Sequence, residues 1–239
     1  MNFPKEFFHI NLRFAQKVSE ISQEPIENAL LNYTNLYIRF GVGRDFDATN
    51  PIWQEYLEGL HQAQGATEWT YHFYLKQQQQ NIAKLKESPF GCFSYTMVSG
   101  DRIRLHFHNN EPSEFSPLSR DRMGKRFVEL QSMFAQIKHD VDNATNVIGA
   151  SWLYNLEAYC RLFPPMYLAT AQVSVKEFPF LPLWGQFIDH HGCTKENLIS
   201  YFLERINEQH NLDDLAECFP FQVLYLESPI QEFFQFYKV

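Results

Sequence analysis

The feature that most constrains the fold of this chain is a change in the spacing of its apolar residues near residue 90. Before that point apolar side chains recur every three or four positions, the spacing of amphipathic helices. From Phe90 apolar and polar residues alternate through FSYTMV and RIRLHFH, the spacing of strands. A chain that begins with helices and then mixes strands with helices is expected to be α+β or α/β, with helices packed on a modest sheet.

Local spacing and capping residues predict the individual elements. Asn50 followed by Pro51 indicates a helix start, because asparagine caps a helix and proline fits its first turn. We expect further helices at 3–21, from 25, at 67–86, from Ser116-Pro117 through the apolar stripe Met123, Phe127, Leu130, Phe134 and Ile137, at 151–163, at 195–208 and at the C-terminus. We expect strands at 36–42, in a β-hairpin within about 90–109, and at 146–151, 172–178 and 221–226.

Length and composition predict a single folded domain over residues 1–239. The chain is 45% hydrophobic and contains 23 phenylalanines, so it has ample apolar surface to offset the loss of chain entropy on folding. We find no internal repeat and no linker-like stretch in it. The expected architecture is a helix-rich N-terminal part packed on a small mixed sheet that contains the hairpin.

Charge and cysteine usage argue against several classes of function. The 20 basic and 28 acidic residues leave a net charge of −8, which disfavours a nucleic-acid partner. No window approaches the roughly 18 apolar residues of a membrane-spanning helix, so we expect no membrane partner. The four cysteines have no CxxC spacing and the N-terminus lacks an apolar signal segment. We therefore expect reduced thiols and a cytoplasmic location.

The segment RLHFHN at 104–109 carries the first candidate site residues. Arg104, His106 and His108 alternate with Leu105 and Phe107, so three chargeable side chains share one strand face. The two histidine Cβ atoms are then roughly 6–7 Å apart, a separation that allows general acid–base chemistry, anion binding or ligation of one metal ion.

Further metal ligands would have to come from Asp189, His190 or His191, far away in the sequence. A His-x-His pair alone is a weak metal signal, so we expect neither a metal ion nor another cofactor. A metal-binding protein that uses the two histidines stays an alternative.

The segment PLSRDRMGKR places four cations where a helix is expected to begin. Helix N-termini carry partial positive charge, so Arg120, Arg122, Lys125 and Arg126 are unfavourable there unless an anion answers them. One interpretation is a bound anion held by free N–H groups, Ser119 and the arginines. The other is that carboxylates from elsewhere in this acidic chain pair with these side chains.

A short connection joins the two segments, which together predict an anion pocket. Its expected catalytic residues are His106 and His108. Its expected binding residues are Arg104, Ser119, Arg120, Arg122, Arg39, Arg44, Ser151 and Asn155. The ligand is expected to be a small phosphorylated or carboxylated molecule, held by an enzyme or a sensor. The alternative of another class is a non-catalytic interaction protein that binds a protein partner through surface aromatic residues, and the sequence leaves the oligomeric state open.

Two further motifs have ordinary structural explanations. DFDAT at 45–49 has the D-x-D-x-T order of haloacid-dehalogenase-type phosphatases, but Gly41, Gly43 and Arg44 precede it instead of a hydrophobic strand. A turn explains this motif better. GASWL places Ser151 at a strand-to-helix junction as in a nucleophile elbow, but Leu153 replaces the second glycine. Ser151 is expected to be a helix cap.

SPLSRDR at 116–122 is similar to the arginine-bearing segment of the histidine phosphatase, or phosphoglycerate mutase, superfamily. This resemblance implies that Arg120 contacts a phosphate. The chain departs from that family elsewhere: Phe40 of Arg39-Phe40-Gly41 stands where the family has its phosphoryl-accepting histidine, and the later His-Gly strand end is absent. The resemblance therefore does not extend to catalysis through a phosphohistidine.

A longer resemblance covers about half of the chain. GASWLYNLEAYCRLFPPMYLATA at 149–171, together with RLHFHN and PLSRDR, resembles an uncharacterised family of bacterial proteins. The resemblance implies a bacterial, cytosolic, single-domain protein, and it implies no particular activity or functional residue.

Overall fold

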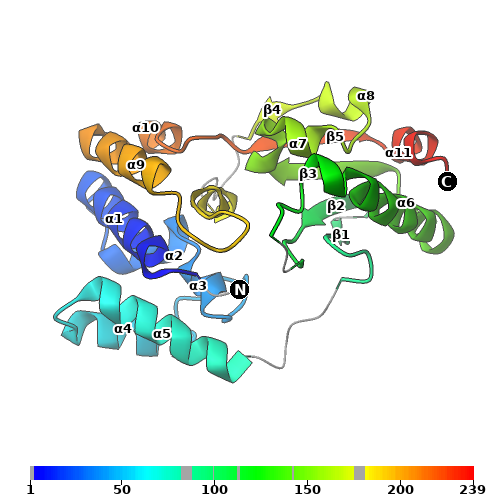
Figure 1. The fold of residues 1–239 in the computed structure, drawn as a ribbon. Coiled ribbons are helices and arrows are strands. Elements are labelled where there is room, and N and C mark those ends of the chain that lie inside the picture. The colour runs from blue at the N-terminus through cyan, green and yellow to red at the C-terminus, as the bar shows by residue number, and fades with distance from the viewer. Residues whose placement is uncertain (1–2, 82–87, 99, 112–113, 142, 175–180) are drawn as a thin grey trace. The chain divides into compact units, whose positions relative to one another are not determined.

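The computed structural model describes residues 3–81, 88–98, 100–111, 114–141, 143–174 and 181–239 (Figure 1). These residues form many helices and one five-stranded mixed sheet, so the expected α+β class is confirmed. Two compact units are present, and each combines two stretches of chain: Met1–Leu85 with Glu177–Pro220, and Lys86–Lys176 with Phe221–Val239. The single domain expected over 1–239 stays a prediction beside this division.

The first unit is built from helices around α1. Its elements are α1 (Lys5–Ser22), α2 (Ile26–Tyr33), α3 (Leu36–Arg39), α4 (Pro51–Gln62), α5 (Ala66–Asn81), the 3-10 helix η4 (Leu181–Phe187), α9 (Glu196–Glu208) and α10 (Leu212–Glu217). The apolar stripe of α1 is buried as its spacing predicts, and Phe14 packs against Trp184, Phe202 and Phe219 with ring centroids 5.4–5.8 Å apart. Aromatic burial of this kind explains the high phenylalanine content of the chain.

The expected strand at 36–42 is wrong, because residues 36–39 form the short helix α3. Leu36, Tyr37 and Phe40 are all fully buried, a pattern in which neighbouring residues and a residue three positions later share one face. That is helical spacing, whereas a strand would turn Leu36 and Tyr37 to opposite faces.

The expected helix start at Asn50-Pro51 is confirmed. The Asn50 side chain accepts a hydrogen bond from the backbone N–H of Ile52 at 3.0 Å, and Pro51 occupies the first helical position of α4. The preceding DFDAT segment forms a turn, in which one Asp47 carboxylate oxygen accepts bonds from the Thr49 backbone N–H and hydroxyl. The helix expected at 67–86 corresponds to α5 over residues 67–81, and the expected residues 82–86 lie outside the described part.

The second unit contains the sheet, whose strands lie in the order β1-β2-β3-β5-β4. Their bounds are β1 (Phe93–Val98), β2 (Arg102–Phe107), β3 (Asn146–Ser151), β5 (Leu224–Pro229) and β4 (Gln172–Val173). The expected hairpin is confirmed, since β1 and β2 pair in antiparallel fashion with Phe93 opposite Phe107. β2 runs parallel to β3, while β5 is antiparallel to both β3 and β4.

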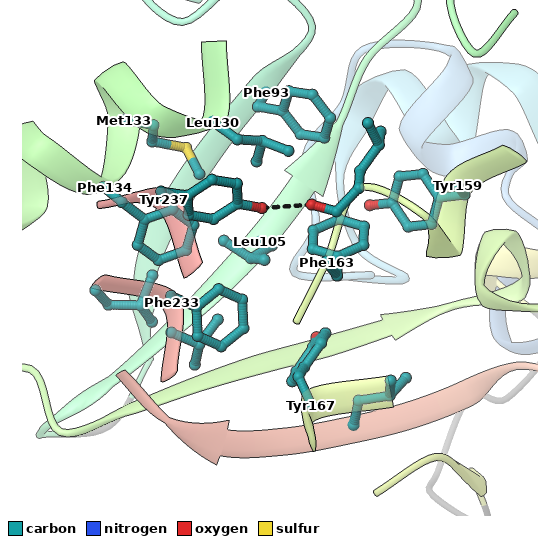
Figure 2. Close-up of a cluster of buried hydrophobic side chains, with 14 of the residues drawn as sticks. Phe93, Leu105, Leu130, Met133, Phe134, Tyr159, Phe163, Tyr167, Phe233 and Tyr237 are labelled. Carbon is teal, nitrogen blue, oxygen red and sulfur yellow. Dashed lines mark hydrogen bonds between the residues drawn. The ribbon is translucent and has the colours of Figure 1, made fainter. Parts of the chain in front are cut away.

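One face of this sheet is apolar and covered by helices. α6 (Met123–Asp140) and α11 (Ile230–Tyr237) supply Phe134, Phe233 and Tyr237, whose rings stack 4.8–5.1 Å apart. Figure 2 shows these rings with Leu105 of β2 and Leu130 of α6, and the Tyr237 hydroxyl donates to the Leu162 carbonyl at 2.7 Å. Because side chains alternate along each strand, the opposite face carries the polar residues.

The helix expected from Ser116-Pro117 begins later. Residues 116–119 form a turn in which the Ser119 N–H donates to the Ser116 carbonyl, and the 3-10 helix η2 (Arg120–Arg122) leads into α6. The predicted stripe is buried at Leu130, Phe134 and Ile137 and partly buried at Phe127, while Met123 is exposed because the helix only begins there. Arg126, from the first turns of α6, is fully buried.

The continuous helix expected at 151–163 is also wrong. The segment forms the 3-10 helix η3 (Trp152–Asn155), an extended Leu156 and the short helix α7 (Glu157–Cys160). The Asn155 amide donates to the carbonyls of Trp152 and Gln222 at 2.8 Å, and these bonds end the first turn. Asparagine competes with helix formation in this way because its side chain bonds to nearby backbone groups.

The remaining expectations are largely met. The expected helix at 195–208 is α9, the strand predicted at 221–226 appears as β5 three residues later, and the terminal helix is α11. β4 covers the start of the strand expected at 172–178, whose last residues lie outside the described part. α8 (Pro165–Leu168) follows the two prolines that were expected to end a helix. No helix among the described residues has both the length and the apolarity to cross a membrane.

Candidate functional site

The hairpin presents a polar face made by alternate residues of β1 and β2. Ile103 and Leu105 point into the apolar core and are buried, so Arg104, His106 and His108 lie together on the other face. His108 stays aligned with the sheet, because its backbone N–H donates to the Cys92 carbonyl at 2.8 Å. The ring centroids of the two histidines are 6.3 Å apart. We call this surface, with Ser94 and Thr96 of β1, the hairpin polar face.

Ser94 and Thr96 are members of this face that the sequence analysis missed. Ser94 Oγ lies 3.0 Å from His108 Nε2, and Thr96 Oγ1 lies 2.9 Å from His106 Nε2. In the hairpin register Ser94 is opposite His106 and Thr96 is opposite Arg104, so both bonds run diagonally across the two strands. The sequence FSYTMV could have indicated them, because Ser94 and Thr96 are two residues apart, as His106 and His108 are on the partner strand.

Arg104 is a cation of this face that forms no ion pair with a carboxylate of the described residues. Its Nε atom is buried and has no hydrogen-bond partner. Most buried side-chain N–H groups do have a partner, so an unpaired guanidinium N–H indicates a place where a ligand oxygen can bind. Arg102, two residues earlier on the same face, instead has its Nη1 atom 3.9 Å from Glu227 Oε2.

The same sheet face continues across β3 and β5 with an acidic residue at its centre. Glu227 accepts hydrogen bonds from the Asn146 amide at 2.9 Å and from the Tyr225 hydroxyl at 2.6 Å. In the sheet register Arg104 pairs with Ile148, and Ile148 pairs with Glu227, so the arginine and the glutamate are about 10 Å apart at their Cα atoms. The ion pair that Glu227 makes within 4.0 Å among the described residues is with Arg102 and not with Arg104.

The arginine-rich segment at 117–126 was predicted to begin a helix that binds an anion, and its residues differ in how they fit that prediction. Ser119 precedes η2 without capping it, and its Oγ atom is buried without a hydrogen-bond partner. Arg120 is exposed and Arg122 is half-buried. Because the first turn here is a three-residue 3-10 helix, the predicted anion site at the start of a longer α-helix stays a prediction for these residues.

Lys125 and Arg126 follow the ion-pair interpretation. Both side chains contact the Glu111 carboxylate, and Arg126 Nη2 also lies 2.8 Å from Glu129 Oε1. Arg126 Nη1 donates to Cys92 Sγ, and the Cys92 backbone N–H donates to Glu129 Oε2 at 3.2 Å. We call Cys92, Glu111, Arg126 and Glu129 the buried arginine cluster. It joins the start of β1 to α6.

The pH dependence of stability is expected to include a contribution from Glu111. Burial alone would raise the pKa of this carboxyl, but hydrogen bonds and charge from Lys125 and Arg126 outweigh it and hold the pKa below its ordinary 4.5. A lowered folded-state pKa stabilises the fold at pH values above the unfolded pKa, and this stabilisation is lost as the pH falls through the folded pKa.

We therefore expect wild-type stability to decline as the pH is lowered below about 4.5, and Glu111→Gln to make that decline shallower. Urea unfolding at a series of pH values measures this. Identical slopes for Glu111→Gln and the wild type would contradict the assignment.

Ser151 and Asn155 have structural contacts in the second unit. Ser151 Oγ accepts a hydrogen bond from the Leu153 backbone N–H at 3.1 Å, so the expected helix cap is present at the start of η3. The Asn155 amide joins two backbone carbonyls, as described above. A binding role for either residue stays a prediction.

Arg39 and Arg44 belong to the first unit. The Arg39 guanidinium lies 4.2 Å from the ring centroid of Phe3, a cation–π contact, and burial lowers its pKa to about 10. With the Asn35 amide oxygen turned toward it, Arg39 also donates two hydrogen bonds at 3.2 Å. Arg44 is exposed in the turn before α4. The Arg39 guanidinium therefore has its cation–π and hydrogen-bond partners, Phe3 and Asn35, within its own unit.

A metal centre finds no support in the described residues, among which no group of three or more His, Cys, Asp or Glu side chains could hold an ion. Asp189 of the DHHG segment serves a turn: its Oδ1 atom accepts bonds from the backbone N–H groups of His191 and Cys193 at 2.8 and 2.9 Å. These bonds, against the opposing effect of burial, lower the pKa of the Asp189 carboxyl.

Each unit has a surface hollow among its described residues. The first, with a volume of about 320 Å³, lies between α2 and α4 and has Leu31, Trp53 and Leu57 among its apolar residues and Glu27, Glu58 and His61 among its polar ones. The second is more open and lies over the end of α6 and α11. Neither is lined by a predicted site residue.

No protein-family model, curated protein or solved structure matches this chain. The resemblances to the histidine phosphatase superfamily and to the uncharacterised bacterial family therefore stay predictions.

Proposed function

We propose that this protein binds a small phosphorylated or carboxylated molecule on the hairpin polar face, as an enzyme or a sensor. The observation that carries the proposal is the buried Nε atom of Arg104, which has no hydrogen-bond partner and lies on the same face as two histidines. An anion would supply the acceptor that this guanidinium lacks.

The composition of the face favours an anion over a cation or an apolar ligand. Arg104 is positively charged, and His106 and His108 become so within the pH range in which imidazoles titrate. Ser94 and Thr96 add hydroxyl groups that donate or accept hydrogen bonds. These five side chains include no carboxylate, so a negatively charged ligand meets attraction and no repulsion from them.

Of the predicted pocket residues, Arg104, His106 and His108 form this face. Ser119, Arg120 and Arg122 lie in the same unit and follow it in the chain after a short connection, part of which lies outside the described residues. Their participation, and that of Ser151 and Asn155 of the same unit, is a further part of the proposal, while a binding role for Arg39 and Arg44 of the first unit stays a prediction. Mutation decides which of them contribute.

The test is the affinity for inorganic phosphate and sulfate, measured by the rise in melting temperature across a concentration series. Arg104→Gln is expected to raise the dissociation constant about tenfold or more, since a hydrogen bond to a charged group contributes about 1.5–3 kcal/mol.

Arg13→Gln is the matched control, because it removes the same charge from an exposed position on α1 in the other unit. It should leave phosphate affinity unchanged. If no anion in a broad panel of phosphates, sulfate and carboxylates stabilises the wild type, the proposal fails. If Arg104→Gln and Arg13→Gln weaken binding equally, the effect is one of net charge and the site assignment is wrong.

The non-catalytic interaction protein stays the alternative of a different class. Large exposed apolar side chains occur on several elements of the described structure, among them Met97 of β1, Val128 of α6 and Tyr201 of α9. Exposed apolar residues on separate elements are normal for a folded protein and do not by themselves indicate a partner.

A further inference from the structure

We propose that Ser94 is the nucleophile of a phosphoryl-transfer reaction on a phosphate monoester, with His108 as its general base. The proposal rests on the proposed anion site and assigns it a reaction and a class of substrate. It starts from the two hydroxyl–imidazole pairs of the hairpin polar face.

The first pair has the geometry of an activated nucleophile. A serine hydroxyl is a weak nucleophile unless a base within about 2.6–3.2 Å can take its proton. Ser94 Oγ and His108 Nε2 are 3.0 Å apart, and both residues are held by the backbone pairing of the hairpin. In the tautomer that carries its proton on Nδ1, His108 accepts the hydrogen bond that Ser94 donates.

The second pair places a proton donor across from the nucleophile. His106 is directly opposite Ser94 in the hairpin register, and its Nε2 atom is held 2.9 Å from the Thr96 hydroxyl. A phosphorus atom bound to Ser94 Oγ would therefore lie beside His108 on the strand face that also carries His106, whose ring centroid is 6.3 Å from that of His108. One acts as base and the other, when protonated, as acid, which is the division of roles that general acid–base catalysis needs.

Arg104 supplies the charge that a phosphoryl group requires. It is two residues from His106 on the same strand face, and its unpaired Nε atom offers a hydrogen bond to a non-bridging oxygen. Fixed positive groups of this kind stabilise the charge on the transferring group in the transition state. Thr96 is opposite Arg104 and acts as a positioning residue for His106.

The reaction proceeds in two balanced halves. Ser94 Oγ forms a bond to phosphorus while the ester P–O bond breaks; the serine proton moves to His108 and the leaving alkoxide takes a proton from His106. Water then attacks the phosphoserine, gives its proton to His106, and the Ser94 oxygen leaves with the proton from His108. The products are an alcohol and inorganic phosphate, and both histidines return to their starting states.

Covalent labelling with diisopropyl fluorophosphate tests the nucleophile without knowledge of the substrate. Attack by Ser94 forms an O–P bond and releases fluoride, and peptide mass spectrometry locates the adduct. Ser132, an exposed serine on α6, is the internal reference in the same sample. We expect Ser94 to be labelled about a hundredfold faster than Ser132, the size of a general-base contribution.

His108→Gln should reduce labelling of Ser94 to the rate of Ser132. Arg13→Gln should leave labelling of Ser94 unchanged, because Arg13 is exposed on α1 of the first unit and does not belong to the hairpin polar face.

The same samples separate this proposal from the anion site on which it rests. Equal labelling of Ser94 and Ser132, with a melting temperature that still rises in phosphate, overturns the nucleophile and leaves the anion site in place. The absence of both effects overturns both. Labelling of Ser94 in the wild type that falls to the rate of Ser132 in His108→Gln, in a protein that phosphate stabilises, supports the assignment in full.

Discussion

Arg126→Ala is expected to lower the free energy of unfolding by about 3–5 kcal/mol, the usual cost of leaving a buried charge without its partner. Arg126 has no exposed surface, and its guanidinium contacts Glu111, Glu129 and Cys92. Removing it leaves two carboxylates poorly solvated and opens a cavity at the start of α6. Urea unfolding followed by circular dichroism measures the change.

Lys125→Ala is the matched control for this prediction. Lys125 is the adjacent residue, contacts the same Glu111 carboxylate and carries the same charge, but its side chain is 54% exposed. We expect a loss of less than about 1 kcal/mol, as for surface ion pairs generally. Similar losses for Lys125→Ala and Arg126→Ala would show that burial of the arginine is not the cause.

A double variant separates charge from packing. Arg126→Met with Glu129→Leu replaces a buried pair with apolar side chains, and such replacements are often neutral or stabilising. We expect this double variant to be more stable than Arg126→Met alone. If it is less stable, loss of packing and not the unpaired Glu129 charge explains the effect of Arg126→Ala.

Gly149→Ala is expected to destabilise the second unit by about 3 kcal/mol, at the upper end of the cost of overpacking a core. A Cβ atom on Gly149 would lie 2.2 Å from the hydroxyl oxygens of both Tyr154 and Tyr167, which are hydrogen bonded to each other at 2.8 Å. Both rings are buried and stiff, so neither can move away without disturbing the core.

Gly124→Ala is the control, because a Cβ atom there meets nothing within 4 Å and the residue lies in α6. It should stabilise the protein slightly, by roughly 0.5–1 kcal/mol, since alanine favours helix more than glycine does. Tyr154→Phe together with Tyr167→Phe should recover part of the loss in Gly149→Ala by removing the two hydroxyls. Thermal unfolding of Gly149→Ala within 1 °C of wild type would refute the explanation.

The glycine of GASWL shows how a motif can be noticed for the wrong reason. Its sequence invited comparison with a nucleophile elbow, in which small residues make room for a sharp turn. In the structure Gly149 makes room for two tyrosine hydroxyls that come from η3 and α8. That requirement comes from Tyr154 and Tyr167, which lie outside the GASWL motif, so the spacing within the motif did not reveal it.

The incorrect element predictions share one cause. Residues 36–42, 116–122 and 151–163 are short stretches in which apolar residues fit more than one period. Burial of Leu36 and Tyr37 on one side, the turn bonds of Ser116 and the amide bonds of Asn155 decide the outcome in each stretch. By contrast, long stripes such as those of α1 and α9 are predicted well because many residues agree.

The candidate site likewise has one part that the local sequence predicts and another part that it does not. The shared face of Arg104, His106 and His108 follows from a period of two, which the backbone of any strand imposes on its side chains. The partners of that face do not follow from it. Ser94 and Thr96 join through the hairpin register, and the charge of Arg126 is answered by Glu111 and Glu129.

The sequence by itself therefore determined the α+β class, the hairpin and the strand face that carries the histidines, because periodicity and turn residues act over a few neighbouring positions. Only the tertiary structure decided which cations are buried in ion pairs, as Arg126 is, and which guanidinium N–H groups, such as that of Arg104, are buried without a partner. Those outcomes depend on desolvation and on hydrogen-bond geometry, which arise when segments distant in the chain pack together.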